Sequence, residues 1–292
     1  MPSLPAQVDY LAGNGAPPPL ALSLAAMDTA RSIGDHLRAW RQRRRMSQLD
    51  LASEADISTR HLSFVESGRS QPSRDMVLHL AERLDIPLRD RNVLLVSAGF
   101  APIFPERQLQ DPQLRSARRA VDLVLTGHEP FPALAVDRHW HLVAANAALE
   151  RLMGGAAPSL LVAPINVLRL SLHPDGLAPR IANLAQWRQH LLERLRRQVE
   201  LSADAVLADL LDELRKYPAP ASSDRASDGN GDFGGVVIPL RLVSEGAILS
   251  FFSTTTVFGT PLDITLSELA LEAFFPADPT TAEALSRLAR AR

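Results

Sequence analysis

The apolar positions between residues 31 and 99 repeat at helical spacing and predict five short helices. Ile33, Leu37 and Trp40 fall on one face of the first helix, because side chains three or four positions apart lie on the same side. Two central helices follow, and a fourth and a fifth are expected over residues 73–84 and 88–98. The pattern therefore predicts an all-α N-terminal domain with five helices.

The second predicted helix opens at Ser47, with Asp50 three residues later. This is a capping-box pattern, which satisfies backbone amides at a helix start. Ala52 is small enough to let another helix cross closely. The turn that follows contains Asp56, a residue type that tolerates the left-handed backbone conformation. We expect the buried side of this helix to consist of Leu49, Leu51 and Ala52.

The third predicted helix begins after Ser58, a favoured N-terminal cap, and has two unlike faces. Leu62 and Val65 define the inner face. The outer face carries no carboxylate and consists of Arg60, Ser63, Phe64 and Ser67, with Thr59 on its flank. Two faces of this kind predict a helix that is anchored on one side and presented to a partner on the other.

The outer face suits the major groove of DNA. Arg60 can offer a guanidinium fork to a guanine edge, Ser63 a hydroxyl group, and Phe64 an apolar surface to a thymine methyl group. A glycine at position 68 accepts the backbone conformation that ends a helix. The residues expected to meet phosphates beyond this stop are Arg69 and Ser70. We interpret the segment as a helix-turn-helix.

An amphipathic helical bundle without a role in DNA binding would explain the inner face equally well. It would not explain why a capping box, a small Ala52, a glycine stop and an outer face without carboxylates occur together at helix-turn-helix spacing. Two side chains remain open to either interpretation. Phe64 could pack against a neighbouring helix, and His61 lies near the inner face, where a structural role is favoured.

The same segment carries the pattern of a known family. The matching residues are Arg41, Ser47-Gln48, Leu51-Ala52, Ile57-Ser58, Glu66-Ser67-Gly68-Arg69, Pro72-Ser73 and Leu80 to Leu84. In these positions the chain resembles the phage-repressor-like (Xre-type) DNA-binding domains. The resemblance implies that Gln48 touches a phosphate or a base-reading side chain, and that Arg41 pairs with Glu66 across the domain core. Such a buried pair would orient helices more than stabilise them.

A change in composition marks the end of this domain. Two prolines lie within Gly99–Arg107, where they end helices and stiffen the chain, so we place a linker at residues 100–112 and a second domain at residues 113–292. Residues 1–30 are rich in Pro, Ala and Gly without a sustained period, and we expect a disordered arm. Apolar positions from Leu114 to Leu125 predict a helix that opens the second domain or pairs with its copy in a dimer.

The second domain mixes strands and helices. It begins with a strand, a turn and a strand, which end at a helix cap, Asn146. The expected elements after the cap are helices over Ala147–Met153, Leu184–Val199 and Val206–Leu214, a polar loop over Ser222–Gly235, β segments over Val236–Val243, Ala247–Phe258 and Asp263–Phe275, and a final helix over Thr281–Arg292. This order predicts an α+β domain with an antiparallel meander, similar at its start to PAS-type sensor domains.

A second resemblance covers this domain. The matching pieces are Gly99-Phe100-Ala101-Pro102, Leu134-Ala135-Val136-Asp137, Ala144-Ala145-Asn146, Leu172-His173-Pro174-Asp175-Gly176, Phe258-Gly259-Thr260-Pro261-Leu262-Asp263 and Phe274-Phe275-Pro276-Ala277-Asp278. Here the chain resembles the MmyB-like ligand-binding domain, which follows Xre-type domains in bacterial regulators. That resemblance implies a PAS-like α+β fold and a pocket for an apolar small molecule, with fatty acids as the implied class of ligand.

Candidate ligand-binding residues follow from this resemblance and from the distribution of aromatic residues. Five of the ten Phe residues lie between positions 251 and 275, and we place Trp140 on a strand and Trp187 on a helix. The full set is Trp140, Leu142, Asn146, Arg169, Arg180, Trp187, Leu191, Phe251, Phe252 and Phe258. A filled core would need the same apolar residues and is favoured for any single aromatic. Either arginine could meet a ligand carboxylate, but a surface role is favoured for each.

Composition limits the range of functions. The chain has 46% hydrophobic and 22% charged residues with a net charge of −2, as in an ordinary globular protein. Six Arg residues face one Asp between positions 31 and 45, which is a modest basic footprint for nucleic acid. The absence of Cys excludes disulfides, thiolate metal sites and cysteine nucleophiles. With no signal peptide or long apolar segment, we expect a cytoplasmic protein without a membrane partner.

Other chemical motifs are weak. His139 and His141 could form a metal pair on one side of a strand, but no third ligand is identifiable. The glycines of Gly229–Gly234 have the spacing of a dinucleotide-binding motif, but the segment leads into a strand where that motif requires a helix. Asp228, Asn230 and Asp232 alternate as in a calcium-binding loop, but Phe233 stands where such a loop needs glycine. We expect no enzyme activity and no cofactor, apart from a bound fatty acid or similar apolar ligand.

These features predict a homodimeric transcription regulator. The helical domain would bind a double-stranded DNA operator with two half-sites, and the second domain would bind a small apolar effector that acts through Gly99–Arg107. Two alternatives remain. The second domain could be a haem- or flavin-binding sensor or enzyme that uses His139 or His141, or it could serve only for dimerisation in a constitutive DNA-binding protein.

Overall fold

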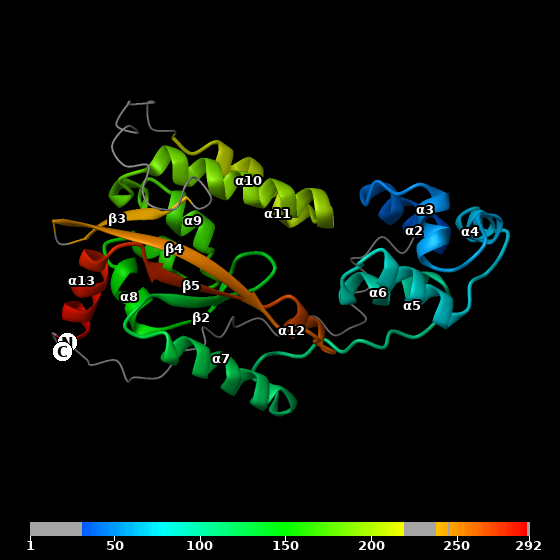
Figure 1. Ribbon diagram of the computed structural model, residues 1–292, viewed down its shortest axis with the longest axis horizontal. Helices are drawn as coiled ribbons and strands as arrows, with labels where there is room; N and C mark the ends of the chain where they lie inside the picture. The colour runs from blue at the N-terminus through cyan, green and yellow to red at the C-terminus, as the bar shows by residue number, and fades with distance from the viewer. Residues whose placement is uncertain (1–30, 219–237, 245, 291–292) are drawn as a thin grey trace. The chain divides into compact units, whose positions relative to one another are not determined.

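The computed structural model describes residues 31–218, 238–244 and 246–290 (Figure 1). Within them the chain forms two compact units. The helical unit contains residues 31–114 together with residues 259–267, and the sheet unit contains the remaining described residues. The expected arm at residues 1–30, the polar loop at 222–235 and the motif at Gly229–Gly234 lie outside the described residues.

The helical unit begins with five helices, as the sequence predicts. They are α2 (Ile33–Arg43), α3 (Gln48–Glu54), α4 (Thr59–Glu66), α5 (Arg74–Arg83) and α6 (Leu88–Ser97), followed by η1 (Pro112–Leu114) and α12 (Ile264–Ser267). A serine caps each of the first four helices by accepting an amide three residues later: Ser32, Ser47, Ser58 and Ser73. Each such cap contributes about 1 kcal/mol of helix stability, so the sequence itself fixes where these helices start.

The core of this unit consists of leucines that are fully buried: Leu37, Leu51, Leu62, Leu80, Leu84 and Leu95. The prediction for Leu49 is wrong, because this side chain is 66% exposed. Positions two apart on a helix are separated by about 200°, so Leu49 cannot share the face of Leu51. The predicted turn conformations are confirmed, since Asp56 and Gly68 have φ angles of 49° and 74°.

The segment after α6 is anchored to that helix. The side-chain oxygen of Asn92 accepts the amides of Ile103 and Phe104 at 3.0 and 3.1 Å, and its amide group donates to the carbonyl of Phe104 at 2.8 Å. This part of the expected linker at residues 100–112 therefore follows a fixed path along α6.

The short helix α12 packs within the helical unit although its residues precede the last strand. The amide of Ile264 donates to the carbonyl of Pro105 at 2.9 Å, and Arg107 pairs with Asp263 at 2.9 Å. The β segment predicted from Asp263 onward is therefore wrong for its first residues. Asp263 accepts the amide of Thr265 at 3.0 Å, a local bond that begins a helical turn.

The sheet unit has five antiparallel strands in the order β2-β1-β5-β4-β3. Its elements are α7 (Arg115–Gly127), β1 (Ala133–Val136), β2 (Leu142–Ala145), α8 (Ala147–Met153), η2 (Pro158–Leu161), α9 (Val167–Leu172), η3 (Ala178–Arg180), α10 (Leu184–Ser202), α11 (Ala205–Arg215), β3 (Leu240–Ser244), β4 (Ala247–Val257), β5 (Ala270–Pro276) and α13 (Pro279–Arg290). The meander of the last three strands is as predicted, and β1 pairs with β5, which closes the PAS-like arrangement.

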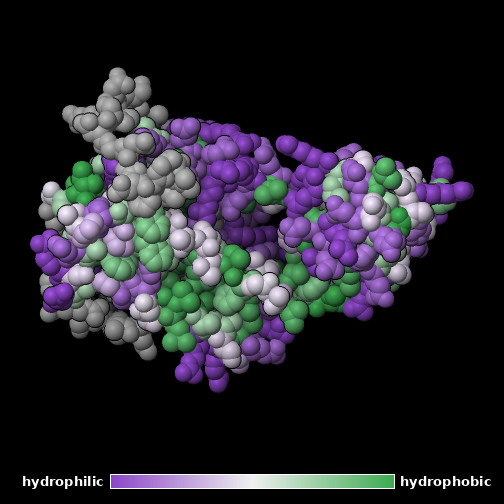
Figure 2. Space-filling view, in the orientation of Figure 1, coloured by the Kyte–Doolittle hydropathy of each residue, from purple (hydrophilic) through white to green (hydrophobic). Residues whose placement is uncertain are grey.

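Two cores flank this sheet. On one face, Leu134 and Val136 of β1 join side chains from α8 to α11 and from α13. On the other face, Ala133 and Ala135 pack beneath α7 with Leu125. Figure 1 shows α10 and α11 side by side over one face of the sheet, with α7 on the opposite face. The outer surface of the α10–α11 pair is hydrophilic (Figure 2), so its apolar stripe faces the sheet.

No helix in the described parts of the chain is both long enough and apolar enough to cross a membrane.

Candidate nucleic-acid interface and ligand-binding domain

The outer face of α4 presents cations around an aromatic ring. Leu62 and Val65 are fully buried and anchor the helix. On the opposite side, the guanidinium carbon of Arg60 lies 5.4 Å from the ring centre of Phe64, and that of Arg69 lies 5.9 Å from it. We call Arg60, Phe64 and Arg69 the α4 cationic cluster. Its two arginines are exposed and its ring is half-buried, so the cluster is accessible from solvent.

The serines near this cluster have mostly structural bonds. Ser58 accepts the amide of His61 at 3.1 Å as the cap of α4. The hydroxyl group of Ser67 donates to the carbonyl of Ser63 at 2.7 Å, which leaves its oxygen as an acceptor only. The amides of Arg69 and Ser70 both donate to the carbonyl of Phe64, so the chain turns sharply after α4. Ser63 and Thr59 are half-buried on the helix surface.

The implied pair of Arg41 and Glu66 is present. Arg41 Nε and Nη2 donate to the two carboxylate oxygens of Glu66 at 2.6 and 2.8 Å. Gln48 Nε2 donates to the same carboxylate at 2.8 Å. Burial opposes the charge of Glu66, but the bonds from Arg41 and Gln48 outweigh it and hold the pKa of Glu66 below its ordinary value. Gln48 is thus fixed at the start of α3 and bound to the end of α4.

The backbones of α2 and α4 approach each other closely at Gly34, a contact that the sequence pattern did not predict. A Cβ atom on Gly34 would lie 2.5 Å from the carbonyl oxygen of Glu66, so only glycine fits at this crossing. Arg38 Nη2 also donates to that oxygen at 2.9 Å. The available signal was a glycine inside an otherwise regular helical pattern, which usually has a packing reason.

The basic footprint is smaller than the sequence suggests. Of the six arginines between positions 31 and 45, Arg44 donates to the carbonyls of Leu84 and Asp85, and Arg43 lies over the ring of Trp40 at 4.3 Å. Arg38 and Arg41 bind the end of α4, as described above. These four arginines hold the unit together, so the α4 cationic cluster is the better candidate for contact with nucleic acid.

Most apolar ligand candidates meet in one core. Five of them are buried between the sheet and the helices above it: Trp140, Leu142, Trp187, Leu191 and Phe251. The other two lie elsewhere, because Phe252 stacks on Phe275 at 5.3 Å and Phe258 packs in the cluster beneath α7. The sequence could not separate these groups, since the face of a residue depends on the strand register.

The polar candidates all have partners inside the sheet unit. Asn146 caps α8 and also binds the backbone at Leu125, Phe131 and Ala133. Arg169 pairs with Glu213 at 2.7 Å. Arg180 donates to the carbonyls of Leu152 and Gly154. These bonds fix all three side chains within the sheet unit.

Trp140 does not lie on a strand. It ends the turn between β1 and β2 with a φ angle of 67°, and its indole donates to Gln198 at 2.8 Å. His139 belongs to this turn, whereas His141 follows it and forms an isolated β-bridge with Asn166, so the two histidines do not share one side of a strand. The structure adds a third residue to the pair, because one ligand atom from each of Asp137, His139 and His141 lies within 4.8 Å of the other two.

Comparisons with known proteins agree with this organisation. Residues 37–90 match the model of a helix-turn-helix domain, and residues 117–288 match that of the MmyB-like transcription regulator ligand binding domain. A protein of Methanoculleus marisnigri, whose name assigns it provisionally as an HTH-type transcriptional regulatory protein, is 36% identical over 119 residues, which cover 39% of this chain and 38% of that protein.

A solved structure of an RNA-binding Light-Oxygen-Voltage receptor aligns with 94% of this chain and 66% of its own chain at 14% identity and a TM-score of 0.27, which is too low to support a conclusion. The chain thus spans well under half of the curated relative and about two thirds of the receptor. The match to the ligand-binding domain covers more than half of this chain. The chain therefore belongs to the MmyB-like transcription regulators, with a helix-turn-helix domain ahead of the ligand-binding domain.

Proposed function

We propose that this regulator reads its operator with the outer face of α4. The supporting observation is the α4 cationic cluster, which is exposed on a helix whose opposite face is anchored by Leu62 and Val65. Glu66, the only acidic residue of α4, turns inward to Arg41, so no carboxylate repels the phosphates from this face. Arg60 would contact a guanine edge and Arg69 a phosphate.

We further propose that the effector is a small apolar molecule of the fatty-acid class. The family resemblance suggests this class, and the core between the sheet and α9 to α11 offers an apolar environment in which five candidate residues meet. A carboxylate at the ligand's end could compete with Glu213 for Arg169, which is only half-buried. The chain itself would act as a sensor and not as an enzyme.

The route of the signal is proposed from the chain's connections. Strands β4 and β5 belong to the sheet unit, but the segment that joins them, Gly259–Ser267, packs within the helical unit. A change at the ends of these strands would therefore pull on Asp263 and, through it, on Arg107. An effector could act in this way only if it binds more tightly to one conformation of the Gly259–Ser267 segment than to another.

We also propose a homodimer that reads two half-sites about one helical turn apart, or a multiple of it. The decisive experiment is a selection of bound DNA from random oligonucleotides, with and without fatty acids of increasing chain length. A palindromic site whose enrichment changes with the lipid would support both the homodimer and the apolar effector. If the lipid leaves the enrichment unchanged and no lipid can be extracted from the purified protein, the second domain would more simply serve only for dimerisation. A visible absorbance band would favour a haem or flavin sensor.

A further inference from the structure

The turn between β1 and β2 is a strained three-residue loop. The amide of Trp140 donates to the carbonyl of Asp137 at 3.1 Å, and the amide of Asp137 donates to the carbonyl of His141 at 3.0 Å. Trp140 has a φ angle of 67°, a conformation that costs about 1 to 3 kcal/mol in residues other than glycine. Burial of its indole beneath Arg194 offsets this strain and leaves the flanking His139 and His141 only half-buried.

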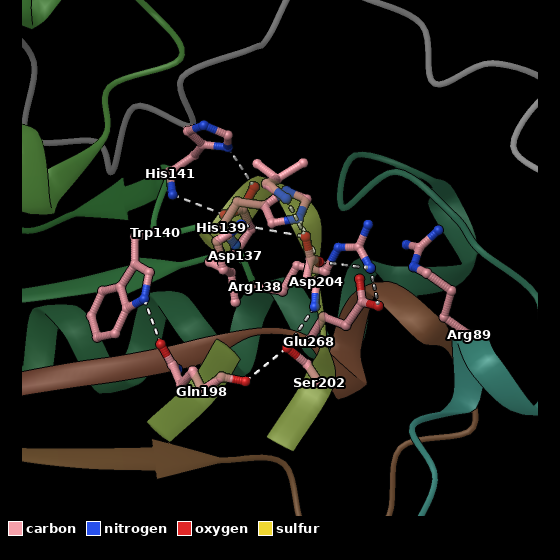
Figure 3. Close-up of polar contacts among 12 residues, drawn as sticks. Arg89, Asp137, Arg138, His139, Trp140, His141, Gln198, Ser202, Asp204 and Glu268 are labelled. Carbon is pink, nitrogen blue, oxygen red and sulfur yellow. Dashed lines mark hydrogen bonds and ion pairs between the residues drawn. The ribbon is translucent and has the colours of Figure 1, made fainter. Parts of the chain in front are cut away.

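The carboxylate of Asp137 is fixed at the centre of this turn. Its Oδ1 accepts the amides of His139 and His141 at 2.8 Å each, and its Oδ2 lies 3.0 Å from Nδ1 of His141 (Figure 3). One ligand atom from each of the three residues lies within 4.8 Å of the others. Bonds of about 2.0 to 2.2 Å to one tetrahedral ion place ligand atoms about 3.3 to 3.6 Å apart. Asp137 and His141 are already near this spacing, and side-chain rotation would have to bring any more distant pair to it.

A fourth residue comes from a distant part of the sequence. Asp204 caps α11, and its Oδ2 lies 2.9 Å from Nε2 of His139. Figure 3 shows the two side chains pointing toward each other. If an ion binds Nε2 of His139, Asp204 is placed to become a further ligand. If the ion binds Nδ1, Asp204 accepts the proton on Nε2 and orients the ring, as carboxylates do behind metal-bound histidines. Asp204 contributes to the site in both cases.

We propose that Asp137, His139 and His141, with Asp204 beside them, bind a divalent transition-metal ion of the zinc class. Two imidazoles with carboxylate oxygens suit zinc, cobalt(II) or nickel(II) better than magnesium or calcium, which prefer oxygen ligands alone. One charge opposes binding, because Arg138 lies 3.7 Å from Oδ2 of Asp204 and also pairs with Glu268. A bound ion would therefore compete with Arg138 for Asp204, which limits the affinity of the site.

The test is a zinc titration of the full chain without a polyhistidine tag, in competition with a chromogenic chelator. We expect one zinc ion per chain. His139→Ala and His141→Ala should each weaken binding by about 100-fold or more, and Asp204→Asn by about 10- to 100-fold. His173→Ala is the matched control, because His173 is also half-buried beside a carboxylate, Asp175 at 3.8 Å, but stands outside the cluster. It should leave zinc binding unchanged.

The effect of Arg138→Gln on zinc affinity distinguishes a metal site from a purely structural network of ion pairs. Removal of a positive charge near the ligands should strengthen zinc binding by about two- to tenfold, whereas a purely structural ion pair predicts no gain. Cobalt(II) absorbance should report nitrogen ligation in the wild-type chain and disappear in His141→Ala. Wild-type zinc affinity equal to that of the His139→Ala/His141→Ala double variant would overturn the proposal, as would an equal loss in His173→Ala. If His139→Ala fails to fold, the more exposed His141 carries the test alone.

Discussion

Arg107 and Asp263 form an ion pair at 2.9 Å although 156 positions separate them in the chain. Asp263 is almost fully buried, and its other oxygen accepts the amide of Thr265. Thr265 in turn donates its hydroxyl group to the carbonyl of Arg107. The connection between β4 and β5 is therefore bound into the helical unit by an ion pair and by hydrogen bonds to the backbone.

The first prediction concerns this pair. Arg107→Gln leaves the carboxylate of Asp263 buried without its cation, which should cost about 1 to 3 kcal/mol locally. The amide of Ile264, which is bonded to Pro105, should then exchange with solvent about 5- to 150-fold faster in hydrogen-exchange measurements. Arg119→Gln, at an exposed arginine of α7, is the matched control and should leave that amide unchanged. Unaltered protection of Ile264 in Arg107→Gln would show that the pair does not hold the segment.

The α4 cationic cluster leads to a second prediction. Arg60→Ala should relax sequence preference at about one base pair and cost about 1 to 3 kcal/mol of specific binding, because a base contact is lost. Arg69→Ala should weaken binding to all DNA sequences alike. It should also reduce the slope of log affinity against log salt concentration by about one. Binding isotherms on specific and random DNA at several salt concentrations measure both effects. Arg83→Ala, in the last turn of α5, serves as the control. Equal losses on both kinds of DNA for the two variants would contradict the assignment of roles.

The helical unit was largely predictable because its signals are local. The caps at Ser47 and Ser58 act within a few residues and predicted the starts of α3 and α4, and apolar repeats at helical spacing predicted α2 and α5. The pairing of Arg41 with Glu66 came from the family resemblance and not from spacing. What the sequence missed here was Gly34, since a close helix crossing depends on the partner helix as well as on the glycine itself.

The ligand-binding domain was predictable in its elements but not in its contacts. The bond between His139 and Asp204 joins positions 65 apart, and no pattern along the chain selects that partner. Trp140 was placed on a strand because the turn lacks the glycine or asparagine that commonly takes a left-handed position. Apolar residues such as Phe251 fill a core or line a pocket with equal ease, so sequence alone cannot distinguish these roles.

A third prediction follows from the lowered pKa of Glu66. Burial raises this pKa, but the hydrogen bonds from Arg41 and Gln48 together lower it by more than burial raises it. The net shift is therefore downward. A carboxyl group with a depressed pKa in the folded state stabilises the fold above its unfolded pKa, and this stabilisation is lost as the pH falls through the folded value. The stability difference between the wild-type chain and Glu66→Gln should thus be largest near pH 7 and should shrink below about pH 4.5.

Urea unfolding of the helical unit at a series of pH values, followed by exchange of the α4 amides, measures this difference. Glu54→Gln is the control, because Glu54 lies on the exposed surface of α3 and should change stability by less than about 0.5 kcal/mol. A difference for Glu66→Gln that stays constant from neutral to acidic pH would mean that the charge of Glu66 does not stabilise the fold.

The last prediction uses the close crossing of α2 and α4. Gly→Ala in a helix normally stabilises it by about 1 kcal/mol, because alanine has the higher helix propensity. At Gly34 the added Cβ would meet the carbonyl oxygens of Glu66 and Val65 at 2.5 and 2.7 Å, and these are backbone atoms that cannot rotate away. Gly34→Ala should therefore destabilise the helical unit by about 1 to 3 kcal/mol and move α4, so that DNA binding weakens as well. Gly127→Ala, at the end of α7 with open space around it, should be neutral or stabilising. If Gly34→Ala behaved like Gly127→Ala in thermal unfolding, the two helices would have to cross with more room than their backbone atoms allow here.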